Sequence, residues 1–386
     1  YHKGKYMIYW GDPDFGIYMV KTKDILGDWD KPVLVLPGKG RIDPSPLFDD
    51  DGKVYLVHAW AGSRAGLNSI MTVCEMNADG TKVISEETLI YDGNDGVNHT
   101  VEGGKFYKKD GYYYLMLGEG GTEYMHSVTI GRSKNLYGPY ESCPLNPILT
   151  HANRRGQANR IQGVGHGDMV QAGDGSWWMV FLGFRVTHQF AYYHVLGRET
   201  FLAPVDWPAG GWPQVNGNGT VSLRMDVPTL PLQPFEAAPV RTEFNEETLG
   251  FEWQYLRNPV RENYSLTEKK GYLRITASPI TLNKADAVSM VCRRQTEHDF
   301  MAATFLEFNP LKDNEEAGMT LIQNKTHHYD LLFKKSGEQR VVQLRVHVGS
   351  LSYIVAEKAV DRDKVLLKIE GTADQYAFYF SDAGKE

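Results

Sequence analysis

The sequence predicts an all-β protein, and three observations support this. A unit made of a short apolar strand, a turn with glycine and an aromatic-rich strand recurs along the first part of the chain, which is typical of β-hairpins. Its turn glycines are Gly4, Gly52, Gly111 and Gly175. Amphipathic helical periodicity is hardly visible there, and aromatic residues make up 12% of the chain. A repeat of about 50 to 65 residues with four strands per unit predicts the blades of a β-propeller.

One position of this repeat carries ionisable residues. Counting back nine residues from the last three turn glycines reaches Asp43, Glu102 and His166. Because the first strand of every blade lines the central channel of a propeller, equivalent positions on successive blades converge near its axis. A series of sandwich hairpins would give similar local signals, but would not explain three such residues in one register. We therefore expect the three side chains to lie close together.

A proline-rich segment separates this region from a second one. Residues 227–240 contain four prolines, which disfavour helix and central strand, and we interpret them as a linker. The propeller domain then covers residues 1–226, and residues 241–386, with short strands and polar turns, predict a β-sandwich. The chain begins inside a hairpin and ends directly after a strand. We therefore expect the complete protein to continue upstream with a first blade, and the sandwich to continue beyond residue 386.

Composition limits the partners. The chain of 386 residues has a net charge of −7 and no basic run, which argues against a nucleic-acid surface. No apolar run is long enough to span a bilayer, so we expect a soluble protein that does not bind membranes. The three cysteines lack the spacing of metal ligands or of a disulfide framework. Whether the protein is cytoplasmic or secreted, and whether it forms oligomers, is left open.

The residues at the shared position suit glycoside hydrolysis. This reaction uses one carboxylic acid to protonate the leaving oxygen and another carboxylate to activate water or to attack, while aromatic side chains hold the sugar. Each residue alone has a structural reading: Asp43 as a turn residue, Glu102 as a costly strand-end carboxylate, His166 as a hydrogen-bonded core histidine. Their common register favours function.

Residues 1 to about 225 resemble the five-bladed β-propeller of glycoside hydrolase family 43, the β-xylosidases and α-L-arabinofuranosidases. The resemblance is carried by the segments 42–47, 101–103, 121–129, 165–170 and 196–204. The region after the linker is similar to the concanavalin-like β-sandwich that many two-domain xylosidases of this family carry. The first blade of the family's propeller has no counterpart in this chain.

The resemblance implies an inverting hydrolysis with three acidic residues. Glu102 matches the general acid, whose pKa must be raised, and Asp43 matches the aspartate that orients this acid and modulates its pKa. The general base, an aspartate of the first blade, matches no residue here, and we expect it upstream of Tyr1. The alternative is a degenerate relative that binds carbohydrate without cleaving it.

Other residues follow from the same resemblance. Arg198 matches the arginine that hydrogen-bonds the sugar, with a surface salt bridge as its structural alternative. His166 matches a channel histidine that contacts the substrate or, in some relatives, a metal ion through water. No cofactor is therefore required, no direct metal ligand is expected, and calcium is the candidate metal. Trp60 resembles a pocket-lining tryptophan, although a core role is nearly as compatible, and Tyr124 and His126 are expected to border the pocket.

The implied substrates are xylan-derived xylo-oligosaccharides or arabinosyl oligosaccharides, from which terminal xylose or arabinose would be released. The choice between the two sugars is left open, because it depends on the shape of the pocket.

Overall fold

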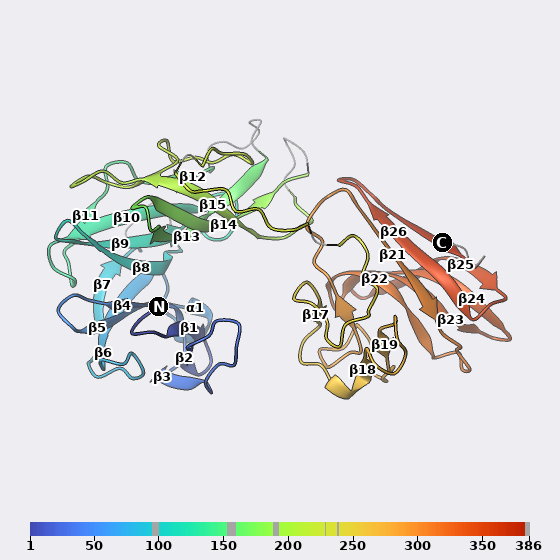
Figure 1. Cartoon of the computed structure of the whole chain (residues 1–386). Helices are drawn as coiled ribbons and strands as arrows, with labels where there is room; N and C mark the ends of the chain where they lie inside the picture. Colours follow the sequence, from blue (N-terminus) through green and yellow to red (C-terminus); the bar gives the residue numbers. More distant parts are fainter. Residues whose placement is uncertain (95–99, 153–159, 188–192, 228, 238, 383–386) are drawn as a thin grey trace. The chain divides into compact units, whose positions relative to one another are not determined.

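The computed structural model describes residues 1–382 except 95–99, 153–159, 188–192, 228 and 238. It is nearly all β, as predicted, and divides into two compact units, Tyr1–Leu232 and Gln233–Glu386 (Figure 1). The described residues form one short α-helix, α1 (Gly62–Ala65), and one 3₁₀ turn, Arg261–Asn263. The division after Leu232 falls within the proline-rich segment. Within the described parts of the chain, we find no helix with the length and apolar character needed to cross a membrane.

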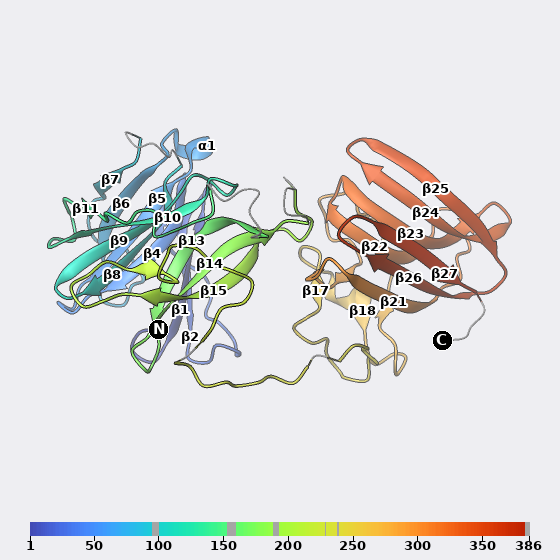
Figure 2. The ribbon, with the colours of Figure 1, turned by 90° about the horizontal axis from the view of Figure 1, so that it is seen from above.

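The described residues of the first unit form four antiparallel sheets that follow one another along the chain, the arrangement expected of propeller blades (Figures 1 and 2). The first sheet comprises β1 (Tyr6–Asp12), β2 (Gly16–Thr22) and β3 (Val33–Pro37). The second comprises β4 (Arg41–Phe48), β5 (Val54–Trp60), β6 (Ile70–Met76) and β7 (Thr88–Asp92). The third comprises β8 (Glu102–Lys109), β9 (Tyr112–Glu119), β10 (Ser127–Ser133), β11 (Glu141–Ser142) and β12 (Leu149–Thr150). The fourth comprises β13 (Ile161–Gln171), β14 (Trp177–Arg185), β15 (Glu199–Asp206) and β16 (Gln214–Val215).

The second strand of a sheet supplies side chains to two cores. In β5, Leu56 belongs to the apolar cluster shared with the first sheet, and Val57 belongs to the cluster shared with the third. In β9, Leu115 and Met116 divide in the same way between the second and the fourth sheet. Because successive side chains of a strand point to opposite faces, a strand between two neighbouring sheets must be apolar throughout. This explains the continuous apolar runs after Gly52 and Gly111.

The four turn glycines adopt the conformation that their spacing predicts. Gly4, Gly52, Gly111 and Gly175 have φ of 77°, 84°, 71° and 86°. Other residues adopt this left-handed region only at a cost, so glycine is favoured at these turns. The first strands of the last three sheets, β4, β8 and β13, contact one another in sequence order. The repeat therefore brings equivalent strands together.

The second unit is a β-sandwich, as predicted. One sheet comprises β22 (Glu316–Asn324), β23 (His327–Ser336), β24 (Gln339–Val348) and β25 (Leu351–Val360). The other comprises β21 (Phe300–Glu307), β26 (Lys364–Gly371) and β27 (Tyr376–Ser381). Phe333, Val342 and Leu367 lie at the centre of the core between them. Two short pairs complete the described strands: β17 (Gln254–Tyr255) with β20 (Val291–Cys292), and β18 (Tyr264–Ser265) with β19 (Arg274–Ile275).

Candidate functional site

The first strands of the second, third and fourth sheets share a β-bulge. In each sheet, the first strand advances three residues where its paired neighbour advances two, so the first strand carries one extra residue. The irregular steps are Ile42 to Ser45, Glu102 to Lys105 and Gly165 to Asp168. A bulge redirects side chains locally and bends the strand. The same deformation therefore recurs at one level of three neighbouring strands.

One residue in each bulge has a left-handed backbone. These residues are Asp43, Gly103 and His166, with φ of 49°, 68° and 48°. They are the equivalent positions of the repeat, and Glu102 lies one residue earlier. The prediction that Asp43, Glu102 and His166 share one position is therefore wrong. The error arises because Gly111 lies one residue closer to its bulge residue, Gly103, than Gly52 and Gly175 lie to theirs. Counting back nine residues from Gly111 therefore passes Gly103 by one and reaches Glu102.

The three ionisable side chains nevertheless meet. Each of Asp43, Glu102 and His166 presents a carboxylate oxygen or ring nitrogen, and these atoms lie within 4.8 Å of one another. The Nδ1 atom of His166 is 3.8 Å from Oε1 of Glu102. The backbone N–H of Gly103 donates to Oδ2 of Asp43 over 3.0 Å. The carboxylate of Asp43 thereby fixes the peptide that follows Glu102.

The surroundings of Glu102 favour its neutral form. Burial is the main cause that raises the pKa of Glu102, the charge of Asp43 raises it further, and the charge of Arg198 opposes both. The side chain of Glu102 is 24% exposed, so it can still reach a ligand. A carboxyl group that keeps its proton near neutral pH can act as a general acid.

The surroundings of His166 favour its neutral form as well. Burial is the main cause that lowers the pKa of His166, partly offset by the charge of Asp43, and Lys105 and Arg198 lower it further. Lys105 lies two residues after the bulge residue of its strand, and so does Asp168, whose charge acts in the opposite direction. Both were missed from the sequence, although each is a charged residue two positions after the bulge residue of its strand, where β4 has Ser45.

Glycines make room for the histidines. A Cβ atom on Gly103 would lie 2.9 Å from Nε2 of His166, and one on Gly165 would lie 2.5 Å from the ring of His126. His126 is 1% exposed, its Nδ1 lies 3.2 Å from the carbonyl oxygen of Gly163, and burial lowers its pKa to about 4. The rings of His126 and His166 meet edge to face, 6.4 Å apart. His126 therefore lies beneath His166, away from solvent.

The other predicted residues surround the cluster to different degrees. Arg198 is exposed, and its charge acts on Glu102, His166 and His126. Trp60 ends β5 and donates from Nε1 to Oγ1 of Thr72 over 3.1 Å. Tyr124 lies between β9 and β10, and its ring packs edge-on against Phe184, 5.2 Å away.

The donor set tests the fit of calcium. Ca²⁺ takes six to eight oxygen ligands, whereas Asp43, Glu102 and His166 offer two carboxylates and one nitrogen, and one carboxylate oxygen of Asp43 already accepts a backbone hydrogen bond. The three residues fit a calcium ion only if water supplies most of its ligands.

A second group of metal-ligand type lies in the sandwich unit, formed by His328, Asp330 and His347. Asn283 contacts the carbonyl of Lys325 with Nδ2, and the same amide nitrogen lies 3.2 Å from Nε2 of His328. Nε2 of His328 must then accept, so its Nδ1 carries the proton that it donates to Asp330 over 2.8 Å. A metal ion bound at this group would have to displace that proton. In the described contacts His328 and Asp330 belong to a hydrogen-bond network.

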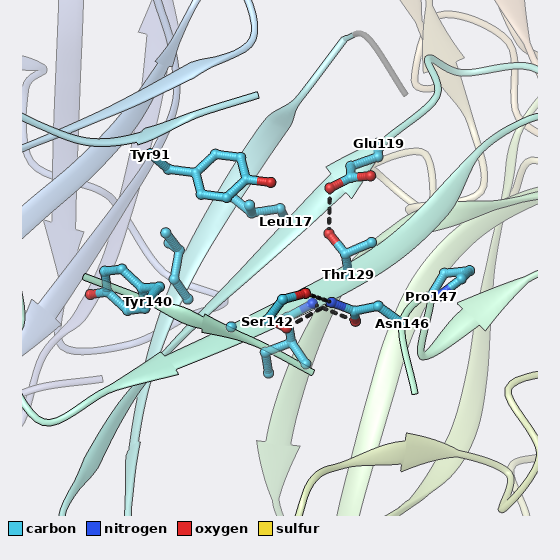
Figure 3. A pocket seen from close by; sticks show the side chains of 11 residues that line it. Tyr91, Leu117, Glu119, Thr129, Tyr140, Ser142, Asn146 and Pro147 are labelled. Atoms are coloured by element: carbon cyan, nitrogen blue, oxygen red, sulfur yellow. Dashed lines mark hydrogen bonds between the residues drawn. The ribbon is translucent and has the colours of Figure 1, made fainter. Parts of the chain in front are cut away.

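A pocket of about 250 Å³ lies between β7, β9 and β10 (Figure 3). Tyr91, Leu117, Glu119 and Thr129 are among its lining residues. As Figure 3 shows, Glu119 accepts a hydrogen bond from Thr129, over 2.7 Å. None of the predicted site residues lines this pocket. It is therefore separate from the cluster around Glu102.

The chain matches known families over most of its length. Residues 1–213 match the family described as glycosyl hydrolases family 43, and residues 241–386 match the β-xylosidase C-terminal concanavalin A-like domain. A non-reducing end α-L-arabinofuranosidase of Bacteroides ovatus is 37% identical over 98% of this chain and 70% of its own length. A β-xylosidase of Bacillus subtilis is 32% identical over 94% of this chain and 70% of its own length.

Solved structures agree with the sequence matches. The family 43 protein B of the Bacteroides ovatus xyloglucan locus superimposes with a TM-score of 0.90 at 35% identity, over all of this chain and 74% of that protein. A xylan β-1,4-xylosidase of Bacillus halodurans gives a TM-score of 0.90 at 29% identity, over all of this chain and 75% of that protein. The chain is a glycosidase, and it belongs to glycoside hydrolase family 43.

Proposed function

We propose that the protein is an exo-acting, inverting glycosidase that removes terminal xylose or arabinose from xylan-derived oligosaccharides. One observation carries this proposal: a carboxyl group whose pKa is raised, Glu102, lies within 4.8 Å of the carboxylate of Asp43 and the ring of His166. Relatives named as arabinofuranosidase and β-xylosidase support the substrate class.

In this proposal Glu102 protonates the glycosidic oxygen as the bond to the sugar breaks. Asp43 acts in two ways: its charge helps to keep Glu102 protonated, and its hydrogen bond from Gly103 fixes the backbone beside the acid. Arg198 and the neutral ring of His166 supply hydrogen-bonding groups for the terminal sugar, and Trp60 offers an aromatic face. The carboxylate that activates water is not assigned to a residue of this chain.

Calcium belongs to the proposal only in a supporting role. His166 would contact it through a water molecule, and the ion would supply positive charge near the terminal sugar.

The test uses the complete protein with xylobiose and with an arabinosyl xylo-oligosaccharide. We expect one of the two to release its terminal sugar, with the anomer opposite to that of the cleaved bond appearing first by NMR. Release of the anomer with the original configuration would contradict the inverting mechanism. Binding of both sugars without release would instead favour the alternative, a carbohydrate-binding protein.

A further inference from the structure

A buried ionic network lies behind Trp60, and neither the proposed mechanism nor the family resemblance uses it. We propose that Glu87 is a positioning residue: through Arg41 and His58 it holds the indole of Trp60 in place as a platform for the sugar ring. This inference rests on the proposed function, because it takes Trp60 to contact the sugar.

Glu87 lies just before β7 and is the centre of the network. Arg41 donates to both of its carboxylate oxygens, from Nε to Oε1 over 3.2 Å and from Nη2 to Oε2 over 2.5 Å. Nε2 of His58 lies 2.5 Å from Oε1 of the same carboxylate. The side chain of His58 is fully buried, and those of Arg41 and Glu87 are 13% and 22% exposed. Charge-assisted bonds in such a protected place are stronger and more directional than surface ion pairs.

The hydrogen-bond pattern shows why this carboxylate is needed. Nδ1 of His58 lies 3.0 Å from the carbonyl oxygen of Ala59, and its Nε2 lies beside the carboxylate of Glu87, so both ring nitrogens are held in place. Arg41 brings a positive charge. Burial alone would raise the pKa of Glu87, but the hydrogen bonds and charges of His58 and Arg41 outweigh it and lower this pKa to about 2. Glu87 is thus the anion that joins Arg41 and His58.

Two contacts connect this network to the indole of Trp60. Arg41 and Trp60 are cross-strand partners on β4 and β5, and the guanidinium carbon of Arg41 lies 4.8 Å from the centre of the indole. At the edge of the ring, Oγ1 of Thr72 accepts from Nε1 of Trp60 over 3.1 Å and lies 3.0 Å from Nε2 of His58. The indole is therefore held on one face by Arg41 and at its N–H edge by Thr72. A sugar ring can stack only on the opposite face.

The same network reaches the carboxylates along the chain. Arg41 lies two residues before Asp43 on β4, immediately ahead of the bulge. Fixing Arg41 therefore fixes the strand that carries Asp43 as well as the partner of Trp60. If the network were only structural, its loss would lower stability without changing the apparent affinity for substrate.

The test measures kcat and KM of the complete protein on xylobiose, or on the arabinosyl substrate if that is the one cleaved. Glu87→Gln keeps the shape of the side chain and removes its charge; we expect KM to rise about tenfold and kcat to change less than about threefold. Trp60→Phe should raise KM by a similar factor. The double variant should be no worse than the poorer single variant, because both disturb one contact.

Two further variants separate positioning from general damage. Glu75→Gln removes a carboxylate from the same sheet, where it pairs with Lys53 at the surface over 2.9 Å, and should leave KM unchanged. Glu87→Asp keeps the charge and should recover part of the affinity. If Glu87→Gln does not fold, Arg41→Lys keeps the positive charge but loses the paired hydrogen bonds and the stacking, and should raise KM in the same way.

The outcomes are distinguishable from those of the proposed function. A normal KM for Glu87→Gln beside a raised KM for Trp60→Phe would overturn the positioning role and leave the glycosidase proposal intact. A normal KM for Trp60→Phe would overturn the inference, because it would show that Trp60 does not bind the sugar. Independent effects of Glu87→Gln and Trp60→Phe, multiplying in the double variant, would also overturn it.

Discussion

The sharpest prediction concerns the proton of Glu102. Replacing it by glutamine keeps the shape of the side chain but removes the proton donor. A general acid contributes about 10²- to 10⁴-fold to the rate. Burial lowers the pKa of His166, 3.8 Å away, which opposes its acting as the proton donor in place of Glu102. We therefore expect Glu102→Gln to lose about 10³- to 10⁴-fold in kcat on xylobiose, or about 4 to 5 kcal/mol.

The assay compares two leaving groups. The leaving group of a nitrophenyl glycoside is nitrophenolate, which departs without being protonated, so the same variant should lose less than about tenfold in kcat on that substrate. KM should stay within about threefold on both, because the substitution preserves shape. Glu119→Gln is the matched control: this carboxylate ends the neighbouring strand and is bound to Thr129, so kcat should be unchanged. Equal losses on both substrates, or unchanged kcat on xylobiose, would refute the role of Glu102 as acid.

Three further predictions concern the neighbours of this acid. Asp43→Asn removes a charge that raises the pKa of Glu102, so the alkaline limb of the kcat–pH profile should move to lower pH. An unmoved limb would show that the charge of Asp43 does not act on the pKa of Glu102. Arg198→Ala removes a charge that lowers the same pKa, so the limb should move to higher pH, with a raised KM from the lost hydrogen bonds to the sugar. Gly103→Ala should lower the melting temperature by more than the roughly 2 to 8 °C expected for Gly52→Ala, since both strain a left-handed backbone but only Gly103 faces a histidine ring; equal losses, with kcat intact in both, would show that this contact is unimportant.

The sequence was sufficient to predict the repeat because its signals are local. A turn that needs a left-handed backbone selects glycine, and a strand between two cores must be apolar throughout, as Leu56 and Val57 show. Both constraints act within a few residues, so they appear in the sequence as a motif. The order and nature of the four described sheets follow from them.

The site was predicted less accurately because it depends on a bulge. The one-residue offset of Glu102 arises because Gly111 lies one residue closer to its bulge than the other two turn glycines, and the side chains alone do not reveal where an extra residue interrupts a ladder. The network around Glu87 was missed for another reason. Its members come from separate strands and from the segment before β7, and only folding brings Arg41, His58 and Glu87 together.

The sandwich shows a similar limit. The apolar segments 301–308 and 341–346 predict strands and match β21 and β24, whereas the sequence does not mark β22, β23 and β25 as clearly. In β23 the buried polar side chains of His328 and Asp330 interrupt the apolar signal, and Asp330 is bound by Thr320 and Arg345 on the neighbouring strands. In β25 nearly every residue is exposed, so burial imposes no alternation on its sequence.

The bulge shared by β4, β8 and β13 restricts how the cluster of Asp43, Glu102 and His166 can be re-engineered. The three equivalent positions cannot exchange their side chains freely. His166 fills the space that a side chain at position 103 would need, so the third sheet contributes its functional group from the residue before Gly103. Transplanting the Asp43 segment onto β8 would place a carboxylate where the imidazole already lies. A design that moves chemistry from one repeat to another must therefore exchange Gly103 and His166 together, as a single coupled pair.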